Sequence, residues 1–143
     1  DPDAFSFSLP RVKTSPIHTS FSGMKTAAME YLRELPAEKQ ADLAASFQKG
    51  VVTALTTMVR RALDQEIPQQ LVVAGGVACN RALRSAMADL AEEKRIELLM
   101  PSPKYCTDNG AMIAWVGWQY LRKGLADDLS LNALARCPLG PSG

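Results

Sequence analysis

Two different spacings of hydrophobic positions divide the chain. Between residues 21 and 66, apolar side chains recur every three or four positions, which predicts amphipathic helices. Ser22 is the expected N-cap of a first helix, and Pro36 suits the first turn of a second helix, in which Gly50 is a weak point. The predicted buried face of the second helix consists of Leu43, Phe47, Val51, Leu55, Met58, Val59 and Ala62.

The second half of the chain alternates short apolar runs with helical segments. "QQLVVAGG" (69–76) and "IELLM" (96–100) are rich in aliphatic residues and predict two strands, the first of them buried. The segment between these runs has a helical period, with Leu83, Met87 and Leu90 facing inwards.

A further strong helix is predicted from "TDNGAMIAWVGWQYLRKG" (107–124). Thr107 or Asp108 is expected to cap its start, with Asn109 as an alternative, and Gly124 ends it after two basic residues. The remaining tail allows one more short helix.

These elements predict an α/β fold in three parts. They are an irregular segment (1–20), a helical subdomain (21–66) and an α/β lobe (67–143) with the order β-α-β-α. Two strands cannot form a free-standing doubly wound sheet. We therefore expect a sheet that is small or is completed by chain absent here, and an apolar face that is partly exposed or drives self-association.

Composition narrows the function classes. Apolar residues make up 47% of the chain and charged residues 22%, which is typical of a globular protein. A net charge of +1 argues against a broad basic surface for nucleic acid, and no apolar run is long enough to span a membrane. Three widely spaced cysteines without a CxxC motif favour free thiols in a cytoplasmic compartment, and one histidine cannot supply a His-rich metal site.

The first candidate site is "LVVAGGVACN" (71–80), a predicted strand that runs into Gly75 and Gly76. Glycines after a strand let backbone N–H groups approach a phosphate, and a following helix adds a favourable dipole. The Asn80 amide both donates and accepts, which suits a ribose hydroxyl or a phosphate oxygen. In the alternative interpretation the glycines only permit a tight turn and Asn80 only caps the helix.

Asp108 in "CTDNGAMIA" (106–114) is the second candidate. It follows a predicted strand at the edge of the sheet where α/β sites gather, and its carboxylate is suited to a divalent metal. The alternative is a plain helix N-cap.

Other candidates are weaker. Lys25 could neutralise a phosphate, although a solvated surface lysine is the simpler interpretation, and His18 is expected at the surface. We expect the aromatic residues of the last helix to belong to the core and an interface and not to stack on bases, namely Trp115, Trp118 and Tyr120.

Five ordered blocks resemble the C-terminal part of the TsaD family, formerly called Gcp or O-sialoglycoprotein endopeptidase. They are "FSGMKTA", "LAASFQ", "LVVAGGVACNRALR", "CTDNGAMIAWVG" and "LARCPLG". The resemblance covers essentially the whole chain and implies the C-terminal lobe of an actin-like ATPase fold, the sugar-kinase and Hsp70 type (ASKHA). The implied reaction transfers a threonylcarbamoyl group from threonylcarbamoyl-AMP to the adenosine next to the anticodon of ANN-decoding tRNAs. The implied bound nucleotide is ATP or threonylcarbamoyl-AMP.

The resemblance also implies roles for individual residues. Asn80 would contact the substrate and nucleotide, Gly75 and Gly76 would form the nucleotide-binding turn, and Asp108 would be the carboxylate ligand of an iron or zinc ion. Implied partners are tRNA with TsaB- and TsaE-like proteins in bacteria, or a second copy in mitochondrial members. No membrane is implied, and the expected location is the cytoplasm or the mitochondrion.

The family's HxxxH metal motif and first phosphate loops have no counterpart in this sequence. We therefore expect the isolated chain to bind metal weakly and to be inactive. Alternatives are a nucleotide-binding or partner-docking module, a different actin-like ATPase such as a sugar kinase, and the older metalloprotease label. The chain has no HExxH motif, which argues against the protease.

Overall fold

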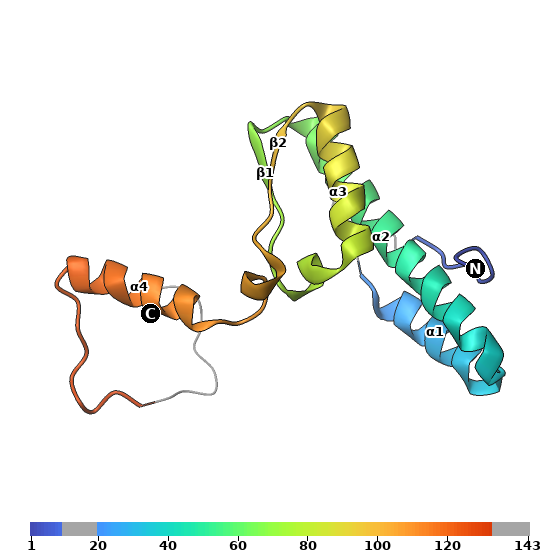
Figure 1. The fold of residues 1–143 in the computed structure, drawn as a ribbon, viewed down its shortest axis with the longest axis horizontal. Helices are drawn as coiled ribbons and strands as arrows, with labels where there is room; N and C mark the ends of the chain where they lie inside the picture. The colour runs from blue at the N-terminus through green and yellow to red at the C-terminus, as the bar shows by residue number, and fades with distance from the viewer. Residues whose placement is uncertain (10–19, 133–143) are drawn as a thin grey trace. The chain divides into compact units, whose positions relative to one another are not determined.

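The computed structural model describes residues 1–9 and 20–132 (Figure 1). These residues form mostly helices with a small parallel sheet, which confirms the predicted α/β class. None of the described helices is long and apolar enough to cross a membrane. The elements in chain order are α1 (Ser22–Glu34), η1 (Ala37–Lys39), α2 (Gln40–Gln65), β1 (Gln70–Val72), η2 (Gly76–Cys79), α3 (Arg81–Lys94), β2 (Glu97–Leu99), η3 (Pro103–Tyr105) and α4 (Gly110–Arg122).

The chain divides into two compact units, Asp1–Thr107 and Asp108–Gly143. The first unit contains α1, α2, α3 and both strands, and the second contains α4. This division falls elsewhere than the change of sequence pattern near residue 66. The three segments expected from that pattern stay predictions.

The two strands pair in parallel, with Leu71 opposite Leu98. Parallel strands need a long crossover connection, and α3 supplies it. The ladder extends beyond the strands, because the Val73 N–H donates to the Leu99 carbonyl over 3.0 Å. Since the strands are parallel, the loops that follow them leave from the same edge of the sheet.

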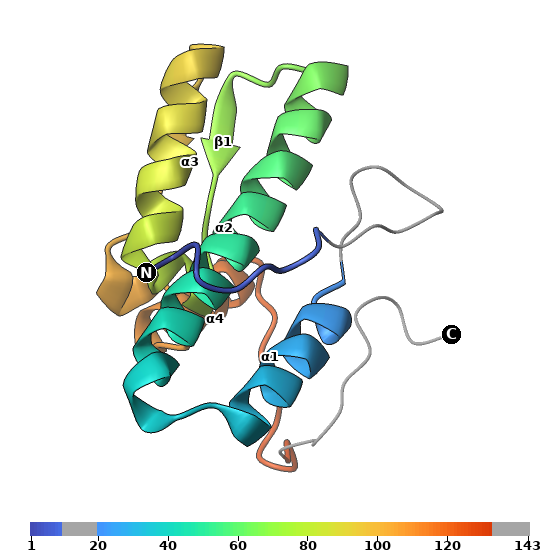
Figure 2. The ribbon, with the colours of Figure 1, turned by 90° about the vertical axis from the view of Figure 1, so that its right-hand side faces the viewer.

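The core of the first unit lies between α2, α3 and one face of the sheet (Figure 2). Val73, Ile96 and Leu98 from the strand segments pack against it. The predicted inward positions of α3 are confirmed. The buried cluster consists of Leu63, Leu83, Met87 and Leu90.

The other face of the sheet is open. Val72 is 64% exposed and Leu99 is also exposed. The expectation that the first strand is buried is therefore wrong, because the described helices α2 and α3 cover only the opposite face. The expected partly exposed apolar face is confirmed.

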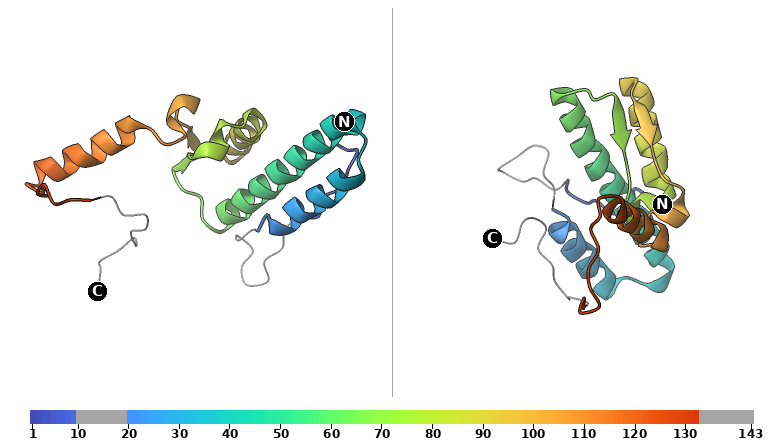
Figure 3. Two further views of the ribbon diagram at one scale, coloured as in Figure 1. Left: turned by 90° about the horizontal axis from the view of Figure 1, so that it is seen from below. Right: turned by 90° about the vertical axis from the view of Figure 1, so that its left-hand side faces the viewer.

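Residues 1–9 pack along the helical pair α1 and α2, which lie side by side (Figure 3). Phe7 stacks edge-on to both Tyr31 and Phe47, with ring centroids 5.8 and 5.5 Å away. A Cβ on Gly50 would lie 3.1 Å from Phe7 Cβ and 2.8 Å from Met24 Cε. Gly50 is thus a point of close approach between segments as well as a weak helix former.

One expected cap is wrong. Ser22 is already helical, and α1 has Phe21 at its N-cap with no side-chain cap hydrogen bond. The Ser22 hydroxyl instead lies 3.0 Å from the hydroxyl of Ser20. Pro36 lies just before the short η1 turn that leads into α2, with a ψ of 148°, so it precedes the first helical turn and does not belong to it as predicted.

Helix α4 exposes its apolar side chains. Trp115 is 61% exposed, and Trp118 and Tyr120 are exposed as well. The expectation that these aromatics form a core is wrong within the described residues, and a role at an interface stays a prediction. The helix ends at Arg122, and Gly124 has a φ of +70°, as predicted for a glycine stop. Residues 125–132 contain no helix, and the rest of the tail lies outside the described residues.

Replacing Leu90, which is 2% exposed, by alanine should remove part of the core between α2 and α3. We expect the free energy of unfolding to fall by about 2–5 kcal/mol, because the vacated volume cannot close fully. Leu32→Ala is the matched control, since Leu32 is 42% exposed and its truncation should cost less than about 1 kcal/mol. Urea denaturation measures both, and equal losses in the two variants would contradict this core.

Candidate functional site

The turn after β1 requires glycine at Gly75. Its φ of +91° and ψ of 168° lie in a region that side-chain-bearing residues rarely adopt. A Cβ built there would meet no atom within 4 Å. Backbone conformation, not packing, therefore demands glycine at Gly75, and the space beside it is open to another molecule.

The segment after Gly75 is a 3₁₀ turn before it becomes α3. The Ala78 N–H donates to the Gly75 carbonyl over 2.9 Å, and the Arg84 guanidinium donates to the Ala78 carbonyl over 3.0 Å. The sequence suggested that the glycines lead directly into a helix. In the structure the 3₁₀ turn η2 lies between Gly75 and α3. Gly76 is the first residue of η2 and has a negative φ, so only Gly75 needs glycine for its conformation.

Asn80 has two hydrogen-bonding roles at the start of α3. Its Oδ1 accepts from the Leu83 N–H over 3.0 Å, so the predicted cap is confirmed. Its Nδ2 donates to Gln48 Oε1 on α2 over 2.9 Å. An amide has two N–H groups and two lone pairs, so each end of Asn80 keeps capacity for one further partner.

Asp108 is an exposed residue and does not cap α4. Asn109 provides the cap, with its Oδ1 accepting from the Met112 N–H over 3.1 Å. The expected caps Thr107 and Asp108 are therefore wrong, and the alternative Asn109 is confirmed. The plain-cap interpretation of Asp108 no longer holds, which leaves its carboxylate available for another role.

The structure brings Gly75, Gly76 and Asn80 together on one turn of the first unit. Asp108 is the first residue of the second unit, so the position of its carboxylate relative to Asn80 is not determined. Among the described residues, no group of three or more His, Cys, Asp or Glu side chains could hold a metal ion. His18 lies outside the described residues. Asp108 can thus be at most one ligand of a metal, and the described chain does not form a complete metal site.

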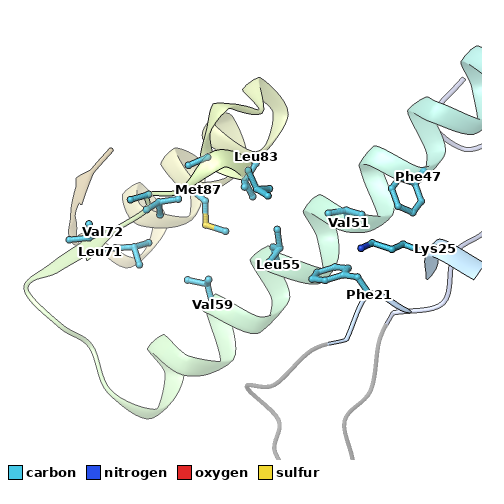
Figure 4. Close-up of a pocket in the computed structure, with 14 residues that line it drawn as sticks. Phe21, Lys25, Phe47, Val51, Leu55, Val59, Leu71, Val72, Leu83 and Met87 are labelled. Carbon is cyan, nitrogen blue, oxygen red and sulfur yellow. The ribbon is translucent and has the colours of Figure 1, made fainter. Parts of the chain in front are cut away.

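An apolar groove of about 530 Å³ lies beside the glycine turn (Figure 4). The β1 segment and the turn supply Val72, Ala74 and Val77, and α2 supplies much of the opposite wall. Lys25 from α1 is the one charged side chain among the described residues that line it. Such a lining suits an aromatic or aliphatic group with a negative charge near Lys25, or an apolar protein surface.

Sequence reasoning missed Gln48. It follows Phe47 on the predicted apolar face of α2, so a polar residue beside that face was the available indication. Its partner could not be predicted, because the pairing of Gln48 with Asn80 depends on how α2 packs against α3.

The model of the TsaD family, described as tRNA N6-adenosine threonylcarbamoyltransferase, matches residues 2–115. The chain belongs to the TsaD family. Curated relatives with that same description are 44% identical in Geobacter metallireducens, 45% in Geobacter sulfurreducens and 41% in Zymomonas mobilis. These alignments cover 97%, 97% and 99% of this chain. They cover 42%, 42% and 40% of the relatives, so this TsaD chain spans about two fifths of their length.

Two substitutions at Asn80 should separate its cap from its other hydrogen bond. Asn80→Ala removes both the acceptor for the Leu83 N–H and the donor to Gln48, and should lower the free energy of unfolding by at least about 1 kcal/mol. Asn80→Asp keeps an acceptor and adds a charge that suits a helix N-terminus, so it should stay within about 0.5 kcal/mol of wild type. Chemical denaturation measures both, and an equally destabilised Asn80→Asp would mean that the bond to Gln48 matters more than the cap.

Proposed function

We propose that this chain is the C-terminal part of a tRNA N6-adenosine threonylcarbamoyltransferase. The family match supports the proposal, and so does the name shared by the relatives in Geobacter and Zymomonas. The structural observation that carries it is the open turn at Gly75, held in a glycine-only conformation next to Asn80. The proposed fold is one lobe of an actin-like ATPase, in which further strands extend the pair β1 and β2.

The proposed substrate is threonylcarbamoyl-AMP, a mixed anhydride of a carbamic acid and a phosphate. The exocyclic amine of the tRNA adenosine attacks the carbamoyl carbon, and a new C–N bond forms. The C–O bond to phosphate breaks, AMP leaves with the electron pair, and the amine loses its proton. The amine is neutral and nucleophilic, so the protein's main tasks are to position the reactants and to stabilise the charge that develops on the leaving group.

In this chain, Asn80 and the turn through Gly75 would bind the adenylate. The remaining N–H and lone pair of the Asn80 amide suit a ribose hydroxyl or a phosphate oxygen. Without a Cβ, Gly75 lets the backbone approach an anion closely. These contacts would fix the adenylate while leaving its carbamoyl group open to the incoming amine.

Asp108 would contribute one carboxylate to an iron or zinc ion whose other ligands come from outside this chain. A bound metal of this kind supplies charge stabilisation at a polarised oxygen. The proposed partners are tRNA with TsaB- and TsaE-like proteins, or a second copy in a mitochondrial member. The proposed location is the cytoplasm, or the mitochondrion for such a member.

A second candidate function is partner docking. It is favoured by the exposed aromatic residues of α4 and by the apolar groove, both of which another protein surface could cover. An isolated chain of this kind would bind partners without turning over substrate.

The transferase proposal is tested by threonine transfer into unmodified tRNA with ATP and bicarbonate, using the full-length protein and its partner proteins. Asp108→Asn should lower the rate by roughly a hundredfold or more, because a lost metal ligand removes several kcal/mol of charge stabilisation. Asp89→Asn, another exposed carboxylate, on α3, is the matched control and should leave the rate unchanged. A wild-type protein that transfers no threonine where another family member does would leave partner docking as the leading function.

The isolated chain should not retain metal. After incubation with ferrous iron or zinc and gel filtration, we expect much less than one metal ion per chain, because the described residues offer no cluster of three ligands. Elemental analysis of the protein peak measures this directly. A stoichiometric metal that Asp108→Asn removes would show that this chain supplies a complete site.

A further inference from the structure

Two cysteine thiols outside the proposed substrate contacts meet at one short stretch of backbone. Cys79 is the last residue of η2, and its Sγ donates to the Pro103 carbonyl over 3.4 Å. Cys106 directly follows η3, and its Sγ donates to the carbonyls of Pro101 and Ser102, each over 3.7 Å. The acceptors are three consecutive carbonyls, so both thiols lie against the same stretch of chain.

The parallel sheet explains this meeting. The loops after β1 and β2 leave from the same edge, and Figure 1 shows the two turns beside each other there. A second pair of residues also brings the two loops close together, since a Cβ on Gly76 would lie 3.9 Å from Thr107 Cγ2. Gly76 belongs to the same 3₁₀ turn as Cys79, and Thr107 is bonded to Cys106. The two loops are therefore packed together over several residues.

The surroundings of the pair affect its reactivity. Cys106 is 5% exposed and Cys79 is half-buried, so the latter is the thiol that a small reagent reaches first. Burial raises the pKa of the Cys79 thiol, and the neighbouring Cys106 thiol raises it further by charge repulsion and a hydrogen bond. Less thiolate is then present at neutral pH, so reaction of Cys79 should accelerate as the pH rises towards its pKa.

We infer that Cys79 and Cys106 form a redox-sensitive dithiol site that a low-molecular-weight disulfide converts into an intramolecular disulfide. The Cys79 thiolate attacks oxidised glutathione, an S–S bond to the protein forms, and one glutathione thiolate leaves. The Cys106 thiolate then attacks Cys79 Sγ and displaces the second glutathione. The dithiol is oxidised by two electrons, one oxidised glutathione is reduced to two thiols, and a reductant reverses both steps.

Each of the two cysteines is close in sequence to a residue named in the proposed function. Cys79 is bonded to Asn80, and Cys106 lies two residues before Asp108. In the reduced state the two loops are joined by non-covalent contacts only. Oxidation would fix the glycine turn to the segment that leads into the second unit. The inference itself does not depend on the proposed function, because it rests on the two thiols and their loops.

The test uses the full chain with Cys137→Ser, so that only the pair remains. The folded protein is treated with oxidised glutathione at mildly alkaline pH, quenched with acid, alkylated and digested with trypsin without reduction. We expect a linked species that joins peptide 62–81 to peptide 105–122, a monomer on a non-reducing gel, and loss of the link after dithiothreitol. A protein that instead carries separate glutathione adducts, forms dimers, or fails to react until it is denatured would overturn the inference.

Single substitutions provide a kinetic control. In the same background, Cys106→Ala should accumulate a stable glutathione adduct at Cys79, since no second thiol is present to displace it. With both cysteines in place, that adduct should be short-lived. Circular dichroism checks that each variant is folded. An adduct equally persistent in the two proteins would mean that Cys106 Sγ does not reach Cys79.

Discussion

The arrangement of this chain depends on the parallel pairing of two short strands. Because β1 and β2 run in the same direction, their following loops must leave from one edge, and the connection between them must cross back as a helix. That helix, α3, buries Met87 and Leu90 against α2 and the sheet, which fixes where Asn80 begins its first turn. The glycine turn and the loop that contains Cys106 lie together because of this strand pairing.

Several apolar surfaces of the described residues are not covered by other parts of the chain. One face of the sheet packs against α2 and α3, while Val72 on the other face is open to solvent. The groove beside the glycine turn and the aromatic side chains of α4 are likewise apolar and uncovered. Surfaces of this kind in one chain are typical of a protein that completes its core with further chain or with partners.

The sequence patterns predicted the helices and strands well, and the burial of those helices and strands less well. The helical spacing of apolar residues predicted α2 and α3, and the run of β-branched residues predicted β1. These predictions succeeded because both patterns reflect local backbone geometry. The inward positions Leu83, Met87 and Leu90 followed from the same period. The prediction that the first strand is buried was wrong, because apolar residues alone do not reveal whether both faces of a sheet are covered.

The candidate site shows the same limit. A strand followed by glycine was sufficient to place a special turn at Gly75, and its positive φ confirms that need. Which of Thr107, Asp108 and Asn109 caps α4 could not be decided, since all three are good caps at adjacent positions. The bond from Asn80 to Gln48 and the meeting of the two thiols depend on tertiary packing, which local patterns do not encode.

The double use of Asn80 affects the energetics of any ligand that binds there. A ligand group that takes the N–H now donated to Gln48 replaces one hydrogen bond with another, so it gains only the difference between them. A group that takes the unused N–H or lone pair adds a bond outright and also restrains the start of α3. In the second case ligand binding stabilises the first turn of α3, and an ordered first turn favours ligand binding. The amide protons of that turn would then exchange more slowly with solvent when the ligand is bound.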